Sequence, residues 1–113
     1  MKSKILALSN NEDFKNLLKK KKISNKFVTI FFGDLAHKNN KKLNISFVTK
    51  KKIGNAVKRN KIKRRLRNIL NEAVKRITLN FNYSYLVIAK PTMLNNDYTN
   101  IKETLFLDFE KIK

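Results

Sequence analysis

The sequence contains no cysteine and no tryptophan, and it has a single proline and two glycines among its 113 residues. The absence of cysteine excludes disulfides and thiolate metal sites, and it fits a reducing cytoplasm. No apolar run approaches the roughly 20 residues that span a bilayer. The apolar stretch from Ile5 to Leu8 is also too short for the core of a signal peptide. We therefore expect a cytoplasmic protein that does not enter a membrane.

Acidic residues are scarce as well, with eight against 27 lysines and arginines, which gives a formal net charge of +19. Such a charge opposes compaction through self-repulsion and implies a polyanionic partner, most commonly nucleic acid. Lys, Asn and Ile are abundant, so part of the basicity can reflect compositional drift on solvated faces. Drift does not explain the arginines, because all five lie between Arg59 and Arg76 and four of them fall within nine residues: Arg59, Arg64, Arg65 and Arg67. Since arginine offers a planar fork of donors, this concentration indicates a functional surface.

The charge is also distributed unevenly along the chain. Residues 35–71 hold thirteen lysines or arginines and no acid. There are no internal repeats and no proline- or serine-rich linkers, so we expect one domain over residues 1–113. A hydrophobic content of 42% is enough for one modest core.

Three segments have the periodicity of helices. The first is expected to begin at a cap, Asn10 or Asn11, and to end at the lysines of residues 19–22. The second spans residues 55–77, and the third begins at about Tyr98. In the second, apolar residues recur every three or four positions, so one stripe faces the core while the opposite side carries Arg59, Lys63, Arg64 and Arg67.

Three further segments, residues 27–33, 43–49 and 83–90, are rich in β-branched and aromatic residues and predict strands. The first two are close enough in sequence to pair as an antiparallel hairpin across a polar loop at 34–42. The resulting order, α-β-β-α-β-α, predicts an α+β two-layer sandwich with a small sheet flanked by helices.

The segment 51–70, KKIGNAVKRNKIKRRLRNIL, joins a glycine-containing turn to the basic helix. Its basic face can present donors to successive phosphates of a folded RNA. The amide of Asn60 can both donate and accept, so it can bridge a phosphate, a sugar hydroxyl or a hydrated metal ion. Gly54 permits a positive φ or a close approach of the backbone to RNA. A solvated basic face remains an alternative for these residues, and a helix cap remains an alternative for Asn55.

No protein active site is evident in the sequence. The single histidine, His37, lies in the polar loop and has no partner in sequence, which is typical of a solvated residue rather than a catalytic base. The acids show no spacing typical of paired carboxylates or of a two-metal nuclease. We therefore expect neither catalytic residues nor metal ligands on the protein.

The segment 51–70 resembles the signature of the bacterial ribonuclease P protein family, in which a Gly-Asn-Ala-Val turn precedes a dense Arg-Asn-Arg helix. NEDF (11–14) and YLVIAKP (85–91) lie where that family has similar segments, so the resemblance covers nearly the whole chain. It implies the protein component of an endoribonuclease holoenzyme that removes the 5′ leader from precursor tRNA. Catalysis would reside in the RNA subunit, with Mg²⁺ held mainly by that RNA and no cofactor bound by the protein alone. The implied partners are the catalytic RNA and precursor tRNA, without DNA or a membrane.

The resemblance also implies a left-handed connection through the long helix, against the usual rule for parallel strands. It assigns RNA binding to Lys51, Lys52, Asn55, Arg59, Asn60, Lys61, Lys63, Arg64 and Arg67. A cleft between the first helix and the sheet would hold the single-stranded leader, lined by Phe14, Leu18, Ile30 and Lys52. Simple core packing is the alternative for Phe14.

The chain departs from the family pattern at four positions. Leu18 and Ile30 stand where the family often has aromatic residues, which puts base stacking there in doubt. Lys61 stands where arginine is usual, and Lys50 stands where a serine often precedes the paired lysines. Both lysines keep or add charge, so phosphate binding survives while the fork geometry at position 61 does not.

Two alternatives come from other classes. A ribosomal protein would share the composition, but it would lack the GNAVKRN turn and helix and the NEDF segment. A DNA-binding architectural protein should carry a helix-turn-helix, an arm or apolar wedges for a groove, and none is evident.

Overall fold

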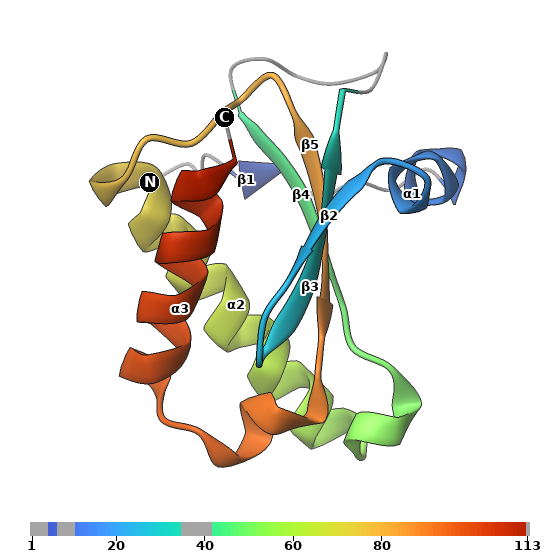
Figure 1. Cartoon of the computed structure of the whole chain (residues 1–113). Coiled ribbons are helices and arrows are strands. Elements are labelled where there is room, and N and C mark those ends of the chain that lie inside the picture. The colour runs from blue at the N-terminus through green and yellow to red at the C-terminus, as the bar shows by residue number, and fades with distance from the viewer. Residues whose placement is uncertain (1–4, 7–10, 35–41, 113) are drawn as a thin grey trace.

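The computed structural model describes residues 5–6, 11–34 and 42–112, which form a five-stranded mixed sheet with helices on both faces (Figure 1). His37, the possible cap Asn10 and most of the loop expected at 34–42 lie outside the described residues. In chain order the elements are β1 (Ile5–Leu6), α1 (Asn11–Leu18), β2 (Lys21–Ser24), β3 (Val28–Gly33), β4 (Leu43–Val48), the 3-10 turn η1 (Lys51–Ile53), α2 (Ala56–Arg76), β5 (Ser84–Ala89), the 3-10 segment η2 (Pro91–Asn95) and α3 (Tyr98–Lys111).

The strand order is β1-β4-β5-β3-β2, and it shows that the predicted hairpin of β3 with β4 was wrong. β5 lies between them, antiparallel to β3 and parallel to β4. The physical reason is the hydrophobicity of β5, whose first four residues are all buried. A strand buried on both faces gains most at the centre of a sheet, so the sequence neighbours β3 and β4 are separated by it.

Two short strands escaped prediction. The lysines of residues 19–22 do end α1, but Lys21 and Lys22 open β2, which pairs antiparallel with β3 at the sheet edge. Lysines are common on edge strands, because exposed charge there discourages pairing with a second chain. At the other edge, β1 pairs parallel with β4.

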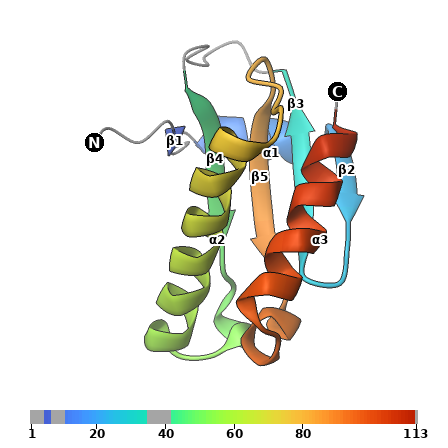
Figure 2. The ribbon, with the colours of Figure 1, turned by 90° about the vertical axis from the view of Figure 1, so that its left-hand side faces the viewer.

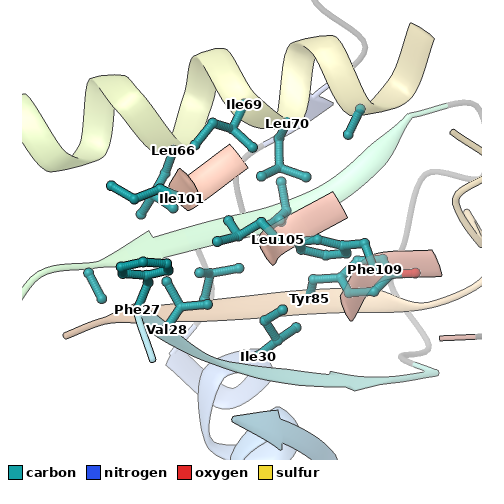
Figure 3. Packing of buried hydrophobic residues seen from close by; sticks show 14 of the residues in the cluster. Phe27, Val28, Ile30, Leu66, Ile69, Leu70, Tyr85, Ile101, Leu105 and Phe109 are labelled. Carbon is teal, nitrogen blue, oxygen red and sulfur yellow. The ribbon is translucent and has the colours of Figure 1, made fainter. Parts of the chain in front are cut away.

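Helices lie on both faces of the sheet, which we call the inner and the outer face (Figures 1 and 2). α2 and α3 cover the inner face, where the main core lies (Figure 3). Its buried members include Ile30, Leu66, Tyr85, Leu105 and Phe109. α1 lies on the outer face, where Leu17 and Leu86 form a second, smaller core. The α+β sandwich with a sheet flanked by helices is confirmed.

The connection from β4 through α2 to β5 is left-handed, as the family resemblance implied. In Figure 2, α2 and α3 lie in front of the sheet, β4 and β5 both run downwards, and β5 lies to the right of β4. This hand is rare among parallel strand pairs. None of the helices in the described residues is both long enough and apolar enough to cross a membrane.

A hydrogen-bonded cluster fastens the turn between β2 and β3 to α3. Asn25 Oδ1 accepts from the backbone N–H of Phe27 at 2.7 Å and of Val28 at 2.9 Å, and its Nδ2 donates to Asp108 Oδ2 at 2.6 Å. The Lys90 ammonium donates to Ser24 Oγ and to the Asn25 carbonyl. Asp108 is only 8% exposed, so its carboxylate depends on the Asn25 amide and on the Lys111 ammonium, at 3.8 Å, rather than on water.

We expect Asn25→Ala to lower the free energy of unfolding by about 2 kcal/mol, because it removes a hydrogen-bond donor from a largely buried carboxylate and leaves two backbone donors without their acceptor. Urea denaturation followed by circular dichroism measures the change. The matched control is Asn100→Ala, at an exposed position of α3, which should stay within about 0.5 kcal/mol of the parent. Equal losses in the two variants would contradict a structural role for the cluster.

Candidate nucleic-acid interface

The basic helix starts from a turn that only glycine adopts easily. Gly54 has φ 152° and ψ −163°, a conformation that L side chains rarely reach. A Cβ atom there would also lie 2.8 Å from Lys58 Cδ. Asn55 follows as the helix cap, its Oδ1 accepting from the backbone N–H of Lys58 at 3.0 Å. The cap interpretation of Asn55 is therefore confirmed, and its side-chain NH₂ remains available as a donor.

One flank of α2 gathers most of the predicted RNA-binding residues. Ile62, Leu66 and Ile69 are buried against the sheet, which fixes the rotation of the helix. The predicted residues Asn60, Lys61, Arg64 and Arg67 are exposed, and Lys63 is half-buried between them. Asn60 is three residues before Lys63 and four before Arg64, and Arg67 is four residues after Lys63 and three after Arg64, so these four lie on one side of the helix. We call Arg59, Asn60, Lys61, Lys63, Arg64 and Arg67 together the basic flank.

Lys51 and Lys52 lie next to the basic flank in η1, and both are exposed. Ile53 is 5% exposed and anchors this turn to the core, so the two lysines are held beside the start of α2. The first turn of α2 contains no acid. Lys58 and Arg59 therefore meet the positive end of the helix dipole without compensation, which costs stability.

The side chains of the basic flank have no ion pair and no hydrogen bond within the part of the chain that the structure describes. Arg59 shows this most clearly, because its Nε atom is buried without any acceptor. The ion pairs that the structure does place lie elsewhere: Lys102 pairs with Glu72 at 3.3 Å and Lys111 with Asp108 at 3.8 Å. The acids thus gather around α3, and the guanidinium groups of the basic flank are available to an external anion.

Arg65 does not belong with the other arginines. It leaves α2 on the side that faces η2, where its Nη1 donates to the carbonyls of Met93 at 3.4 Å and Asn96 at 3.3 Å. These bonds satisfy carbonyls of the segment that precedes α3. The arginine cluster seen in the sequence therefore contains one structural member, and the others remain candidates for binding.

The outer face of the sheet presents a second candidate surface beneath α1. Phe14, Phe31, Val48 and Ile88 are half-buried around Leu17 and Leu86, and we call these six residues the outer-face patch. η1, with Lys52, lies on the same side of the sheet as α1 (Figure 1). Phe14 is half-buried: part of its ring packs on the smaller core, and part remains accessible to solvent.

Two of the residues predicted to line a cleft are not in this patch. Ile30 is 0% exposed and belongs to the main core on the inner face, so its assignment to the cleft was wrong. Side chains alternate along β3, and Phe31 is the neighbour that points to the outer face. Leu18 is 48% exposed, and Leu17 is the residue of α1 that faces the sheet. Val48 and Ile88 were not identified from the sequence.

No group of three or more His, Cys, Asp or Glu side chains that could hold a metal ion occurs in residues 5–6, 11–34 and 42–112. Tyr85 has the clearest perturbation among the ionisable groups: burial raises its pKa well above the ordinary value, and its hydroxyl donates to the Asn80 carbonyl at 2.7 Å. Tyr85 lies in the main core and serves packing rather than chemistry.

The basic flank and the outer-face patch define a nucleic-acid-binding protein of the α+β class. The family model "Ribonuclease P" matches residues 3–113. A ribonuclease P protein component from Carboxydothermus hydrogenoformans is 30% identical over 98% of this chain and 94% of that protein. Among solved structures, the ribonuclease P protein of Staphylococcus aureus is 27% identical with a TM-score of 0.70, covering 94% of this chain and 93% of that one. The protein from Thermotoga maritima shares the fold at a TM-score of 0.80 and 21% identity, covering 96% and 98% of the two chains.

The chain therefore belongs to the ribonuclease P protein family, whose members are protein components of an endoribonuclease holoenzyme. Its role is that of a subunit in processing the 5′ ends of tRNA, and its partner in the holoenzyme is RNA. The family membership removes the two alternatives, a ribosomal protein and a DNA-binding architectural protein.

The different surroundings of Arg65 and Arg64 lead to a prediction about stability. Arg65→Ala should lower the free energy of unfolding by about 1–2 kcal/mol, because two backbone carbonyls lose a charged donor. Arg64→Ala removes the same charge from an exposed position of the same helix and should stay within about 0.5 kcal/mol of the parent. Urea denaturation of both variants compares them directly. An Arg64→Ala variant as unstable as Arg65→Ala would show that the basic flank also supports the fold.

Proposed function

We propose that the basic flank, with Lys51 and Lys52, binds the catalytic RNA of ribonuclease P, and that the outer-face patch holds the 5′ leader of precursor tRNA. Catalysis resides in the RNA, with Mg²⁺ held mainly by that RNA, and the holoenzyme works in the cytoplasm. The observation that carries the proposal is the set of unpaired basic side chains on one flank of α2, including the desolvated Arg59 Nε.

Energetics support a functional reading of this flank. Lysines and arginines in the first turns of α2 oppose the helix dipole and repel one another, so the free protein gains no stability from them. Phosphates would relieve both penalties by accepting hydrogen bonds from the exposed lysines and arginines of this flank. Asn60 can reach the same backbone, since its amide both donates and accepts. A solvated basic face would not require a desolvated guanidinium nitrogen.

The outer-face patch supports the second half of the proposal by its chemistry. Half-buried aromatic rings bind unpaired bases by stacking, with little sequence preference, because every base has a π-face. Phe14 and Phe31 supply two such rings, and Lys52 in η1 supplies charge on the same side of the sheet. A leader differs in sequence between precursors, so a sequence-tolerant surface suits it.

The first prediction from this proposal concerns binding of the catalytic RNA. Arg59→Ala, Arg64→Ala and Arg67→Ala should each weaken assembly with the large catalytic RNA by about 1–3 kcal/mol, the range for charge-assisted hydrogen bonds. Each should also reduce the salt dependence of binding by about one phosphate contact. Filter-binding titrations over a range of salt concentrations measure both quantities.

Arg76→Ala is the matched control, because it removes the same charge from the opposite, C-terminal end of α2. It should leave the affinity and the salt dependence nearly unchanged. If all four variants behaved alike, binding would reflect net charge rather than the basic flank. Unchanged salt dependence in the first three variants would place the RNA contact elsewhere.

The second prediction concerns the leader. Phe14→Ala and Phe31→Ala should weaken binding of a precursor with a leader of several nucleotides by about 1–3 kcal/mol, the usual cost of losing one stacked base. Binding of mature tRNA should change little, because that substrate lacks the leader. The affinities of both substrates are measured with holoenzyme reconstituted from each variant, at low magnesium.

Leu18→Ala serves as the comparison on α1, since this side chain lies outside the patch, and it should cost less than Phe14→Ala. Protein without RNA should cleave neither substrate. Equal losses for precursor and mature tRNA would make Phe14 and Phe31 packing residues, and the assignment of the leader site would fail.

A further inference from the structure

A separate hollow lies at the far end of the sheet from the basic flank. Its volume is about 420 Å³, and its walls come from Lys19, Lys20, Lys21, Phe32, Gly33, Asp34 and Tyr83. β3 ends and β5 begins beside it, whereas η1 and the start of α2 follow the opposite end of β4. Its volume falls within the range of small-ligand pockets, about 300–1,000 Å³. We call it the basic–aromatic pocket.

Two aromatic rings form one wall of the pocket. The centroids of Phe32 and Tyr83 are 5.6 Å apart, and the ring planes are inclined by 46°. Phe32 is buried, so it holds its position, while Tyr83 is half-buried and keeps part of its surface accessible. A supported but accessible ring of this kind can stack on a planar ligand, and it does so for any nucleobase.

Three successive lysines, Lys19, Lys20 and Lys21, also line the pocket. The turn after α1 is fixed by two backbone hydrogen bonds, from Lys19 N to Asn16 O at 3.1 Å and from Lys20 N to Leu17 O at 3.0 Å. The side chain of Lys20 crosses the end of β3, because a Cβ on Gly33 would lie 2.7 Å from Lys20 Cγ. Glycine at position 33 thus leaves room for the lysine. All three lysines are exposed.

We propose that the basic–aromatic pocket binds one nucleotide of single-stranded RNA, with its base against Tyr83 and its phosphate among Lys19, Lys20 and Lys21. Three lysines outweigh the single acid of the lining, Asp34, so the pocket favours an anionic ligand. An acidic peptide could use the lysines, but it offers no aromatic group to stack on the Tyr83 ring.

The proposal takes from the proposed function only that the ligand is RNA, and its residues lie outside both the basic flank and the outer-face patch. Photocrosslinking of the full chain tests it directly. The probe is a hexauridylate that contains 4-thiouridine, and mass spectrometry locates the attachment. A crosslink at or beside Tyr83 is the expected result. Crosslinks confined to α2, or to Phe14 and Phe31, would overturn the proposal.

Affinity measurements with the same hexauridylate, fluorescently labelled, separate stacking from charge. Tyr83→Leu should weaken binding about fivefold or more, the lower end of the effect of one stacked base, while Tyr83→Phe should bind as the parent does. Lys20→Gln should weaken binding and reduce its salt dependence. Lys75→Gln, an equal change of charge at an exposed site near the end of α2, should do neither.

Thermal melts show whether each variant folds. If Tyr83→Leu does not fold, the comparison of Lys20→Gln with Lys75→Gln still tests whether the pocket binds the hexauridylate. Parent-like binding by both Lys20→Gln and Tyr83→Leu would overturn the proposal. So would displacement of the hexauridylate by hexaglutamate at equal concentration, which would indicate a general anion site. Arg64→Ala should weaken binding of the catalytic RNA and leave that of the hexauridylate unchanged. The proposal for the pocket and the proposal for the basic flank can therefore be contradicted separately.

Discussion

Burial of both faces of β5 is the constraint on which the rest of the structure depends. Tyr85 and Val87 point into the main core beneath α2 and α3, while Leu86 points to the smaller core beneath α1. Because β5 needs cover on both sides, the helices divide between the two faces, and β3 and β4 pair with its two edges. The same arrangement leaves the far side of α2 exposed and the outer face of the sheet only partly covered by α1, and these are the two surfaces suited to RNA.

The basic flank shows stability given up for binding. A more stable helix would place acids in its first turn and would pair its basic side chains with acids, as Lys111 of α3 pairs with Asp108. α2 instead begins with lysine and arginine and buries the Arg59 Nε without an acceptor. Its attachment to the fold comes from apolar residues on the opposite side, such as Ile62 and Leu66, and from Arg65, which holds η2. Binding and attachment thus use different sides of one helix.

The sequence predicted the long elements well, because α2, α3, β4 and β5 have strong periodicity or strong hydrophobicity. It also offered a helix cap as one alternative for Asn55, and helical spacing alone placed Arg64 and Arg67, which are exposed, opposite the apolar stripe. It failed where local pattern carries too little information. Strand pairing depends on which segment is buried on both faces, so β3 and β4 were wrongly joined. Ile30 and Phe31 are both apolar, so only the fold could show which of them points to the outer face.

The gathering of acids around α3 has a consequence for how the protein meets its partner. Half of the eight acids fall in residues 97–110, and none falls in residues 35–71. Basic side chains therefore predominate over η1 and α2 but not over α3, which gives the molecule an electric dipole. In the field of a polyanion such a dipole aligns before contact, so encounters begin with α2 leading rather than with α3. Electrostatic steering of this kind raises the association rate, and it weakens as salt shortens the range of the field.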